Sequence, residues 1–239
     1  MLSEQQSSDF EHVAGNAAGS NTAVPGWMQS MQQQWKLYAG VVAVVVIGIG
    51  AAWWYTSSSD EKNAAAAAEL ARIRSVFEAG QFEQALSGEG VMVGDQQAMG
   101  LKQIADTYGS TPAGQVAALL TGNSLVNLGK FTEAEPYFTS ARSSSALIVE
   151  VGAIQGLASC MEATGNYAGA ADLYVEAAKR AADTGLEPAC YLKAALCFEA
   201  AKDTKQAADA YTTIAKQYET SEVAPQAKTG LARLGMAID

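Results

Sequence analysis

Hydrophobic residues are distributed in three different ways along this chain of 239 residues. Residues 1–26 are rich in Ser, Ala, Gln, Asn and Gly and show no apolar periodicity, which is typical of a disordered tail. Residues 37–57 form one uninterrupted run without a charged residue. From residue 62 onward, apolar and small residues recur at helical spacing between polar ones. The pattern predicts a polar tail at 1–36, one transmembrane helix at 37–57 and an all-α domain at 62–239.

The apolar run is long enough to cross a bilayer. As a helix, residues 37–55 would extend about 28 Å, against a hydrocarbon thickness of about 30 Å. Aromatic residues stand near both of its ends, as they do in helices that span a membrane. A cleaved signal peptide would have a shorter apolar region after a short basic leader, whereas 36 residues with one Lys precede this run. We therefore predict a retained single-pass anchor.

The residues around the run indicate its orientation and a contact face. Trp27, Met31 and Trp35 recur every four residues, which predicts an amphipathic turn at 27–35 in the membrane interface. A short tail before the span and a large acidic domain after it favour a cytoplasmic amino terminus, although the Lys and Arg count is nearly balanced. Small residues on one helix face either admit a second helix or only make the span flexible. These residues are Gly40, Val44, Gly48 and Ala52.

The domain that follows the run repeats itself. Three alanines are separated by 36 and 37 residues, each with an aromatic residue four positions later and a small residue twelve positions earlier. The alanines are Ala134, Ala170 and Ala207, the aromatic residues are Phe138, Tyr174 and Tyr211, and the small residues are Gly122, Ala158 and Ala195. Small residues on both helices of a hairpin let them approach closely, and the aromatic ring then fills the space against the next hairpin.

This spacing resembles that of the tetratricopeptide repeat family, whose unit of about 34 residues is a pair of helices. The resemblance implies an α-solenoid of stacked hairpins. Residues 214–234 echo residues 104–120: both segments end one helix, turn through polar residues around a Pro and begin another helix. In the later copy this would be a solvated cap helix with Lys228 and Arg233 among its apolar positions. The segment 87–100 contains several glycines but lacks the residues of a phosphate-binding loop, so we expect a loop between hairpins there.

The plan of a tail, one span and tandem repeats is similar to that of the ancillary-subunit family of the bacterial Sec translocon. That resemblance implies a periplasmic domain at the inner membrane, with translocon subunits and periplasmic chaperones as partners. An accessory structural subunit of another inner-membrane complex, or a cell-division or envelope coordinator with the same kind of repeat, is the alternative.

The composition argues against catalysis and metal binding in the repeat domain. The one histidine, His12, lies in the polar tail, so the domain lacks imidazole for a catalytic base or a metal site. A net charge of −10 disfavours nucleic-acid binding. The chain has three cysteines, Cys160, Cys190 and Cys197, and none of them forms a CxxC motif. This odd number and spacing favour buried thiols over one disulfide plus a free thiol. We expect no enzyme activity, no cofactor and no metal.

In a solenoid of this kind, the first helix of each hairpin lines the inner groove. The candidate partner-binding residues are Asn123, Asn127, Gln155, Ser159, Glu162 and Glu199. They are neutral or acidic, and therefore lack the Lys and Arg that would clamp a terminal carboxylate. Asn123 and Asn127 are suited to hydrogen-bond an extended backbone. A carboxylate enzyme using Glu162 and Glu199 is the competing interpretation, but nothing in the sequence shields these acids from water. The expected function is a scaffold that binds protein partners or extended polypeptide.

Overall fold

The computed structural model describes residues 59–236, which are helical apart from turns and one short β-hairpin. The first described helix covers 59–78 and ends before Gly80, whose φ of 74° is incompatible with its continuation. The helices that follow are α2 (Phe82–Ser87), α3 (Leu101–Tyr108), α4 (Pro112–Asn127), α5 (Phe131–Ala141), α6 (Leu147–Ala163), α7 (Tyr167–Arg180), α8 (Glu187–Ala200), α9 (Thr204–Gln217) and α10 (Ala224–Arg233). The prediction of a helical repeat domain is confirmed.

The predicted membrane helix at 37–57 lies outside the described residues, as do its contact face and the interfacial turn at 27–35. Within residues 59–236, none of the helices combines the length and the apolar character that a membrane crossing requires.

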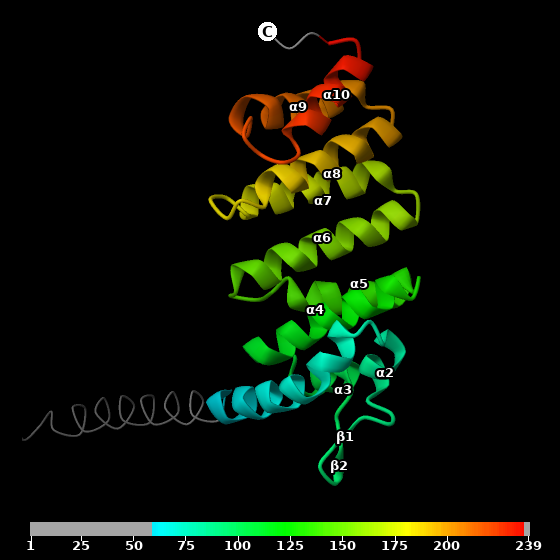
Figure 1. Cartoon of the computed structure of the whole chain (residues 1–239), viewed down its shortest axis with the longest axis vertical. Helices are drawn as coiled ribbons and strands as arrows, with labels where there is room; N and C mark the ends of the chain where they lie inside the picture. The colour runs from blue at the N-terminus through cyan, green and yellow to red at the C-terminus, as the bar shows by residue number, and fades with distance from the viewer. Residues whose placement is uncertain (1–58, 237–239) are drawn as a thin grey trace, which may run out of the picture. The chain divides into compact units, whose positions relative to one another are not determined.

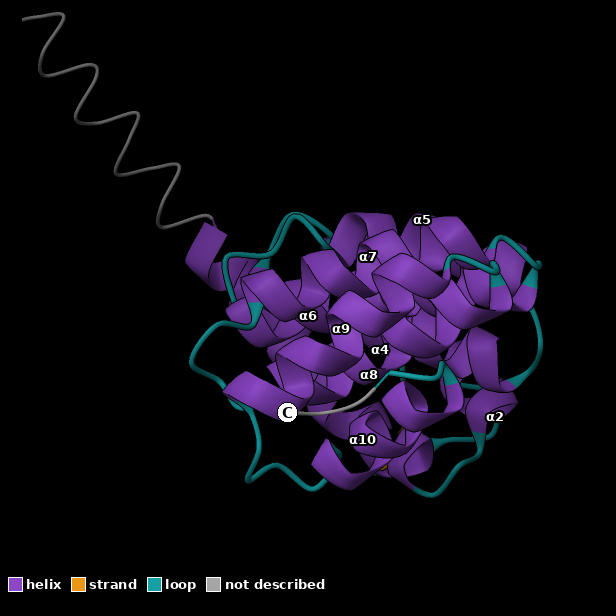
Figure 2. Cartoon of the chain, turned by 90° about the horizontal axis from the view of Figure 1, so that it is seen from above, coloured by secondary structure: helices purple, strands orange, loops and turns teal. Residues whose placement is uncertain are grey.

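Helices α4 to α9 form three hairpins that stack into a column (Figure 1). Helix α4 pairs with α5, α6 with α7, and α8 with α9; between the hairpins, α5 packs on α6 and α7 packs on α8. Viewed along the column, α5 and α7 lie on one side and α10 lies on the other (Figure 2). Helix α10 packs on α9 and also contacts α8, so it covers the end of the last hairpin. It therefore occupies the place predicted for the cap helix.

Each hairpin turns at a residue with left-handed backbone. This residue is Gly129 in the first hairpin, Gly165 in the second and Lys202 in the third, with φ between 63° and 84°. The next helix then begins at a polar residue in the second and third hairpins, where the side chains of Asn166 and Asp203 accept hydrogen bonds from backbone N–H groups. The short polar segments between the repeats therefore end one helix and begin the next.

The predicted wedge between hairpins is present at Phe138. Its side chain is fully buried, and it lies against Gly122 of its own hairpin and Gly156 of the next. A Cβ atom at Gly122 would come within 2.6 Å of the ring, and one at Gly156 would also overlap it. Tyr211 has the same relation to Gly230 of α10, where an added Cβ would lie 2.5 Å from the ring. Because glycine has no side chain, these three positions leave room for the aromatic rings that pack between neighbouring helices of the column.

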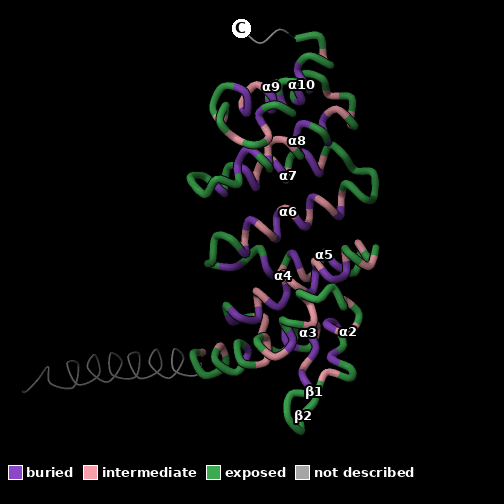
Figure 3. The backbone as a smooth tube through the Cα atoms, viewed as in Figure 1, coloured by how far each residue is buried: buried purple, intermediate pink, exposed green. Residues whose placement is uncertain are grey.

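The segment 87–100 differs from the expected loop because it contains a β-hairpin. Strand β1 (Met92–Val93) pairs with β2 (Gln96–Gln97) in antiparallel register. Gly94, with a φ of 65°, takes the first position of the two-residue turn, as glycine does in type II′ turns. All four strand residues are exposed, and the hairpin extends away from the helical column (Figure 3). Strands of two residues are too short to produce a recognisable alternating pattern in the sequence.

Candidate functional site

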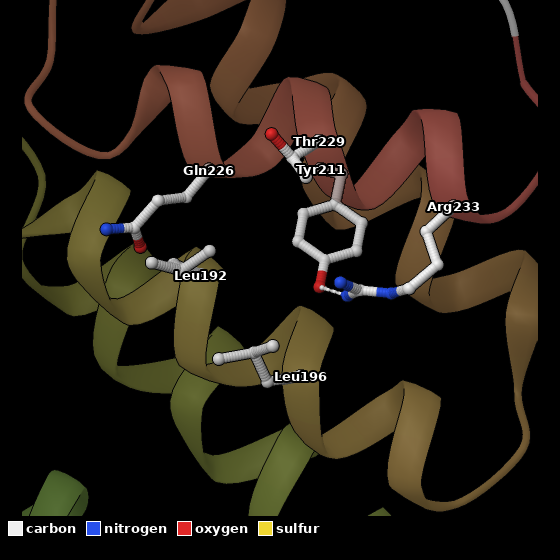
Figure 4. A pocket seen from close by; sticks show the side chains of 6 residues that line it. All are labelled: Leu192, Leu196, Tyr211, Gln226, Thr229 and Arg233. Atoms are coloured by element: carbon white, nitrogen blue, oxygen red, sulfur yellow. Dashed lines mark hydrogen bonds between the residues drawn. The ribbon is translucent and has the colours of Figure 1, made fainter.

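A groove between α8 and α10 brings together apolar and polar side chains at the carboxyl-terminal end of the column (Figure 4). Its volume is about 230 Å³, and it is lined by Leu192, Leu196, Tyr211, Gln226, Thr229 and Arg233. Leu196 is 49% exposed and lies beside Leu192 on the lining of the groove. The groove therefore presents an apolar floor to solvent.

Helical periodicity places these side chains opposite one another. Leu192, Leu196 and Glu199 follow the spacing i, i+4, i+7 and so share one face of α8. Gln226, Thr229 and Arg233, shown as sticks in Figure 4, follow i, i+3, i+7 along α10. The other face of α10 is apolar and buried through Ala227 and Leu231, among others. Its packing on the column leaves the polar face as one wall of the groove.

One end of the groove is closed by a hydrogen-bonded ion pair. Arg233 Nε and Nη2 donate to the carboxylate of Glu199 at 3.1 and 2.7 Å, and Nη2 also lies 3.3 Å from Tyr211 Oη. Burial raises the pKa of Glu199, but hydrogen bonds from Arg233 and Tyr211 outweigh it and bring the pKa below the ordinary value. Glu199 is therefore ionised at neutral pH, and its charge offsets that of Arg233. Arg233 is consequently a partner of Glu199 rather than only a solvated residue of the cap.

A related arrangement occurs one repeat earlier. Glu162 precedes Glu199 by 37 residues, and its Oε2 accepts a hydrogen bond of 3.1 Å from Tyr174 Oη. Lys193 Nζ lies 5.3 Å from the centroid of the Tyr174 ring, where it makes a cation–π contact. In the first hairpin, Val126 and Phe138 stand at the positions of the glutamate and the tyrosine. The combination of glutamate, tyrosine and cation is therefore confined to the second and third hairpins.

The predicted partner-binding residues all lie on α4, α6 and α8, the first helices of the hairpins, but most have partners within the chain. Asn127 is exposed and donates to the backbone oxygen of Asn123, and Gln155 Nε2 donates to Cys190 Sγ at 3.1 Å. Asn123 and Ser159 are half-buried. Glu162 and Glu199 each interact with the tyrosine of their own hairpin, Tyr174 and Tyr211 respectively.

None of the six residues that line the groove was predicted as a binding residue from the sequence, although the repeat interval points to two of them. Leu192 and Leu196 stand 37 residues after Gln155 and Ser159 and thus at equivalent positions of the next repeat. Applying the repeat interval to Gln155 and Ser159 would have identified them. Leucines in an alanine-rich helix are otherwise indistinguishable from core residues, since their spacing also suits a buried face.

The cysteines provide no reactive centre within the part of the chain that the structure describes. Cys160, Cys190 and Cys197 are buried and unpaired. Burial raises the pKa of all three thiols, to about 11 for Cys160 and for Cys197, so they are protonated at neutral pH. No group of His, Cys, Asp and Glu side chains between residues 59 and 236 has an arrangement suited to a metal ion.

Comparison with known protein families gives a match over the helices that carry the groove floor. A family model described as tetratricopeptide repeat matches residues 189–221, which include almost all of α8 and the whole of α9. The match and the stacked hairpins together support a tetratricopeptide-repeat protein, and such repeats generally mediate protein–protein interactions. Neither the curated proteins nor the solved structures contain a match.

Proposed function

We propose that this protein is a scaffold without catalytic activity and that it binds a segment of a partner protein in the groove between α8 and α10. The observation that carries the proposal is the exposure of Leu196 beside Leu192 on the groove floor. An apolar surface rimmed by polar groups is typical of a site that another protein covers. The proposal includes no cofactor, no metal and no nucleic acid, in keeping with the composition and the net charge of −10.

We further propose that residues 37–57 anchor the protein in the bacterial inner membrane, with the repeat domain in the periplasm. In this setting the scaffold would be accessory to Sec translocation or to periplasmic chaperoning. The proposal is supported by the uncharged apolar run and by the order of tail, span and repeats. The small-residue face from Gly40 to Ala52 favours a second candidate, an accessory structural subunit or envelope coordinator held by another transmembrane helix.

Site-specific photo-crosslinking in intact membranes tests the groove. A photoreactive residue at Leu196 should form adducts with a defined partner protein, identified by mass spectrometry. The matched control is the same residue at Ile148, which is 60% exposed but lies in the first turn of α6, away from the groove. Equal adducts from both positions, or none from Leu196, would contradict binding in the groove. The identity of the adducts distinguishes translocon subunits and chaperones from components of another membrane complex.

A further inference from the structure

We infer that the groove between α8 and α10 selects an uncharged segment of polypeptide, which inserts one large aliphatic side chain between the two helices. The inference rests on the proposed function and adds the chemistry of the partner. It follows from the size of the groove, from its charge balance and from the position of its remaining hydrogen-bond donors.

The size of the groove limits what it can hold. Its volume of about 230 Å³ is below the range of roughly 300–1,000 Å³ that is usual for small-molecule pockets. The floor consists of the two leucines, while the ring of Tyr211 stands at one end (Figure 4). This space suits a single large side chain and the peptide groups beside it.

The charge balance of the groove disfavours a charged side chain. Arg233 is the one charged residue among its lining residues, and the bidentate contact with Glu199 offsets that charge. A charged group that entered would lose its hydration without gaining a counter-ion. Two charged residues near α8, Glu162 and Lys193, are close to Cys197 and Tyr174, on the side of α8 that faces the second hairpin.

Two hydrogen-bond donors flank the leucines. A guanidinium group has five N–H donors, and Arg233 uses Nε and Nη2 for Glu199 and Tyr211. Its Nη1 has no hydrogen-bond partner among residues 59–236, and neither does the side-chain amide of Gln226. These groups stand at opposite ends of the leucine floor (Figure 4). Carbonyl oxygens on either side of the inserted residue are the acceptors that these donors would bind.

The test measures binding of labelled host peptides to the full-length protein in nanodiscs by fluorescence anisotropy. The peptides consist of Ser, Gly and Asn with three spaced copies of one guest residue: Leu, Ala, Asp or Lys. We expect the Leu peptide to bind best, the Ala peptide about tenfold more weakly, and the Asp and Lys peptides weakest. Raising NaCl from about 50 to about 500 mM should change the affinity of the Leu peptide less than twofold, because no unpaired charge takes part.

Protein variants assign the binding to the groove. Leu196→Ala should weaken the Leu peptide about tenfold, while Ile148→Asp should leave its affinity unchanged. Arg233→Lys keeps the charge beside Glu199 but removes Nη1, and we expect a several-fold loss with an unchanged circular dichroism spectrum.

Three results would overturn the inference. One is a preference for the Lys or Asp peptide together with strong salt dependence. Another is equal affinity for all guests. The third is a change in sedimentation of Leu196→Ala without any peptide binding, which would make a second copy of the chain the occupant. If Leu196 still forms crosslinks to a partner protein in any of these cases, the proposed function stands and only the aliphatic selection fails.

Discussion

Replacing Gly156 by alanine tests the contact that holds the first and second hairpins together. The added methyl group would overlap the ring of Phe138. The ring cannot retreat easily, because it is fully buried and also lies against Gly122. The substitution therefore forces either the ring or the two hairpins to move.

The expected loss is the difference between two opposing effects. Overpacking of a buried contact costs about 1–3 kcal/mol, and the rigid, enclosed ring favours the upper end of that range. Alanine is also a better helix former than glycine by about 1 kcal/mol. The net destabilisation of Gly156→Ala should be about 2 kcal/mol. For a protein of this size, that corresponds to a decrease of roughly 4–8 °C in melting temperature.

A second glycine of the same helix provides the control. At Gly152 the nearest atom to an added Cβ is 3.3 Å away and belongs to the flexible side chain of Leu119. Gly152→Ala should therefore raise the melting temperature by up to roughly 4 °C through helix propensity. Far-UV circular dichroism of both variants measures the contrast, and Phe138→Leu should reduce the penalty in Gly156→Ala. If Gly156→Ala melted at or above the temperature of Gly152→Ala, the wedge of Phe138 between the hairpins would be refuted.

Three further predictions concern packing, pH and topology. Ala170→Leu should destabilise the domain by about 1–3 kcal/mol because Ala170 is fully buried between close helices, and an unchanged melting curve would disprove the repeat register. Because the pKa of Glu199 is lower in the folded state, the stabilisation by Arg233 should be present above about pH 4.5 and be lost as the pH falls through the folded pKa. The pair is partly exposed, so in urea titrations Arg233→Ala should lower the unfolding midpoint only slightly at neutral pH, and this difference from the parent should disappear once the pH is below the folded pKa of Glu199. Protease added to spheroplasts should degrade the repeat domain but not the amino-terminal tail, and protection of the domain until the inner membrane is broken would reverse the predicted orientation.

The contacts between neighbouring helices could be predicted because they depend on residues at fixed spacing. The spacing of Gly122 and Phe138, sixteen residues apart, predicted a helical hairpin. It also predicted that the ring of Phe138 would fill the space that the glycine leaves. The turns of the first two hairpins are equally local, because glycine readily takes the left-handed backbone that Gly129 and Gly165 have there.

Contacts between distant residues could not be predicted in the same way. Arg233 and Glu199 are 34 residues apart, and both have the sequence surroundings of solvent-exposed charges. Their pairing depends on how α10 packs against the last hairpin, which periodicity does not specify. The β-hairpin at 92–97 was missed for the opposite reason, because its pairing is local but too short to leave a pattern.

The contacts between helices change from apolar to ionic along the column, and this change predicts which end of the column unfolds first. The first interface relies on Val126 and Phe138, which do not titrate, whereas the last one includes the pair of Glu199 and Arg233. In a repeat protein each unit is stabilised mainly by its neighbours, so the end with the weakest interface opens first. As the pH falls through the lowered pKa of Glu199, the contact of α10 should therefore weaken before the contacts of the remaining hairpins, and amide hydrogens of α10 should exchange earlier than those of α4 to α9. Since α10 forms one wall of the groove, its detachment would release a bound segment while the rest of the column stays folded.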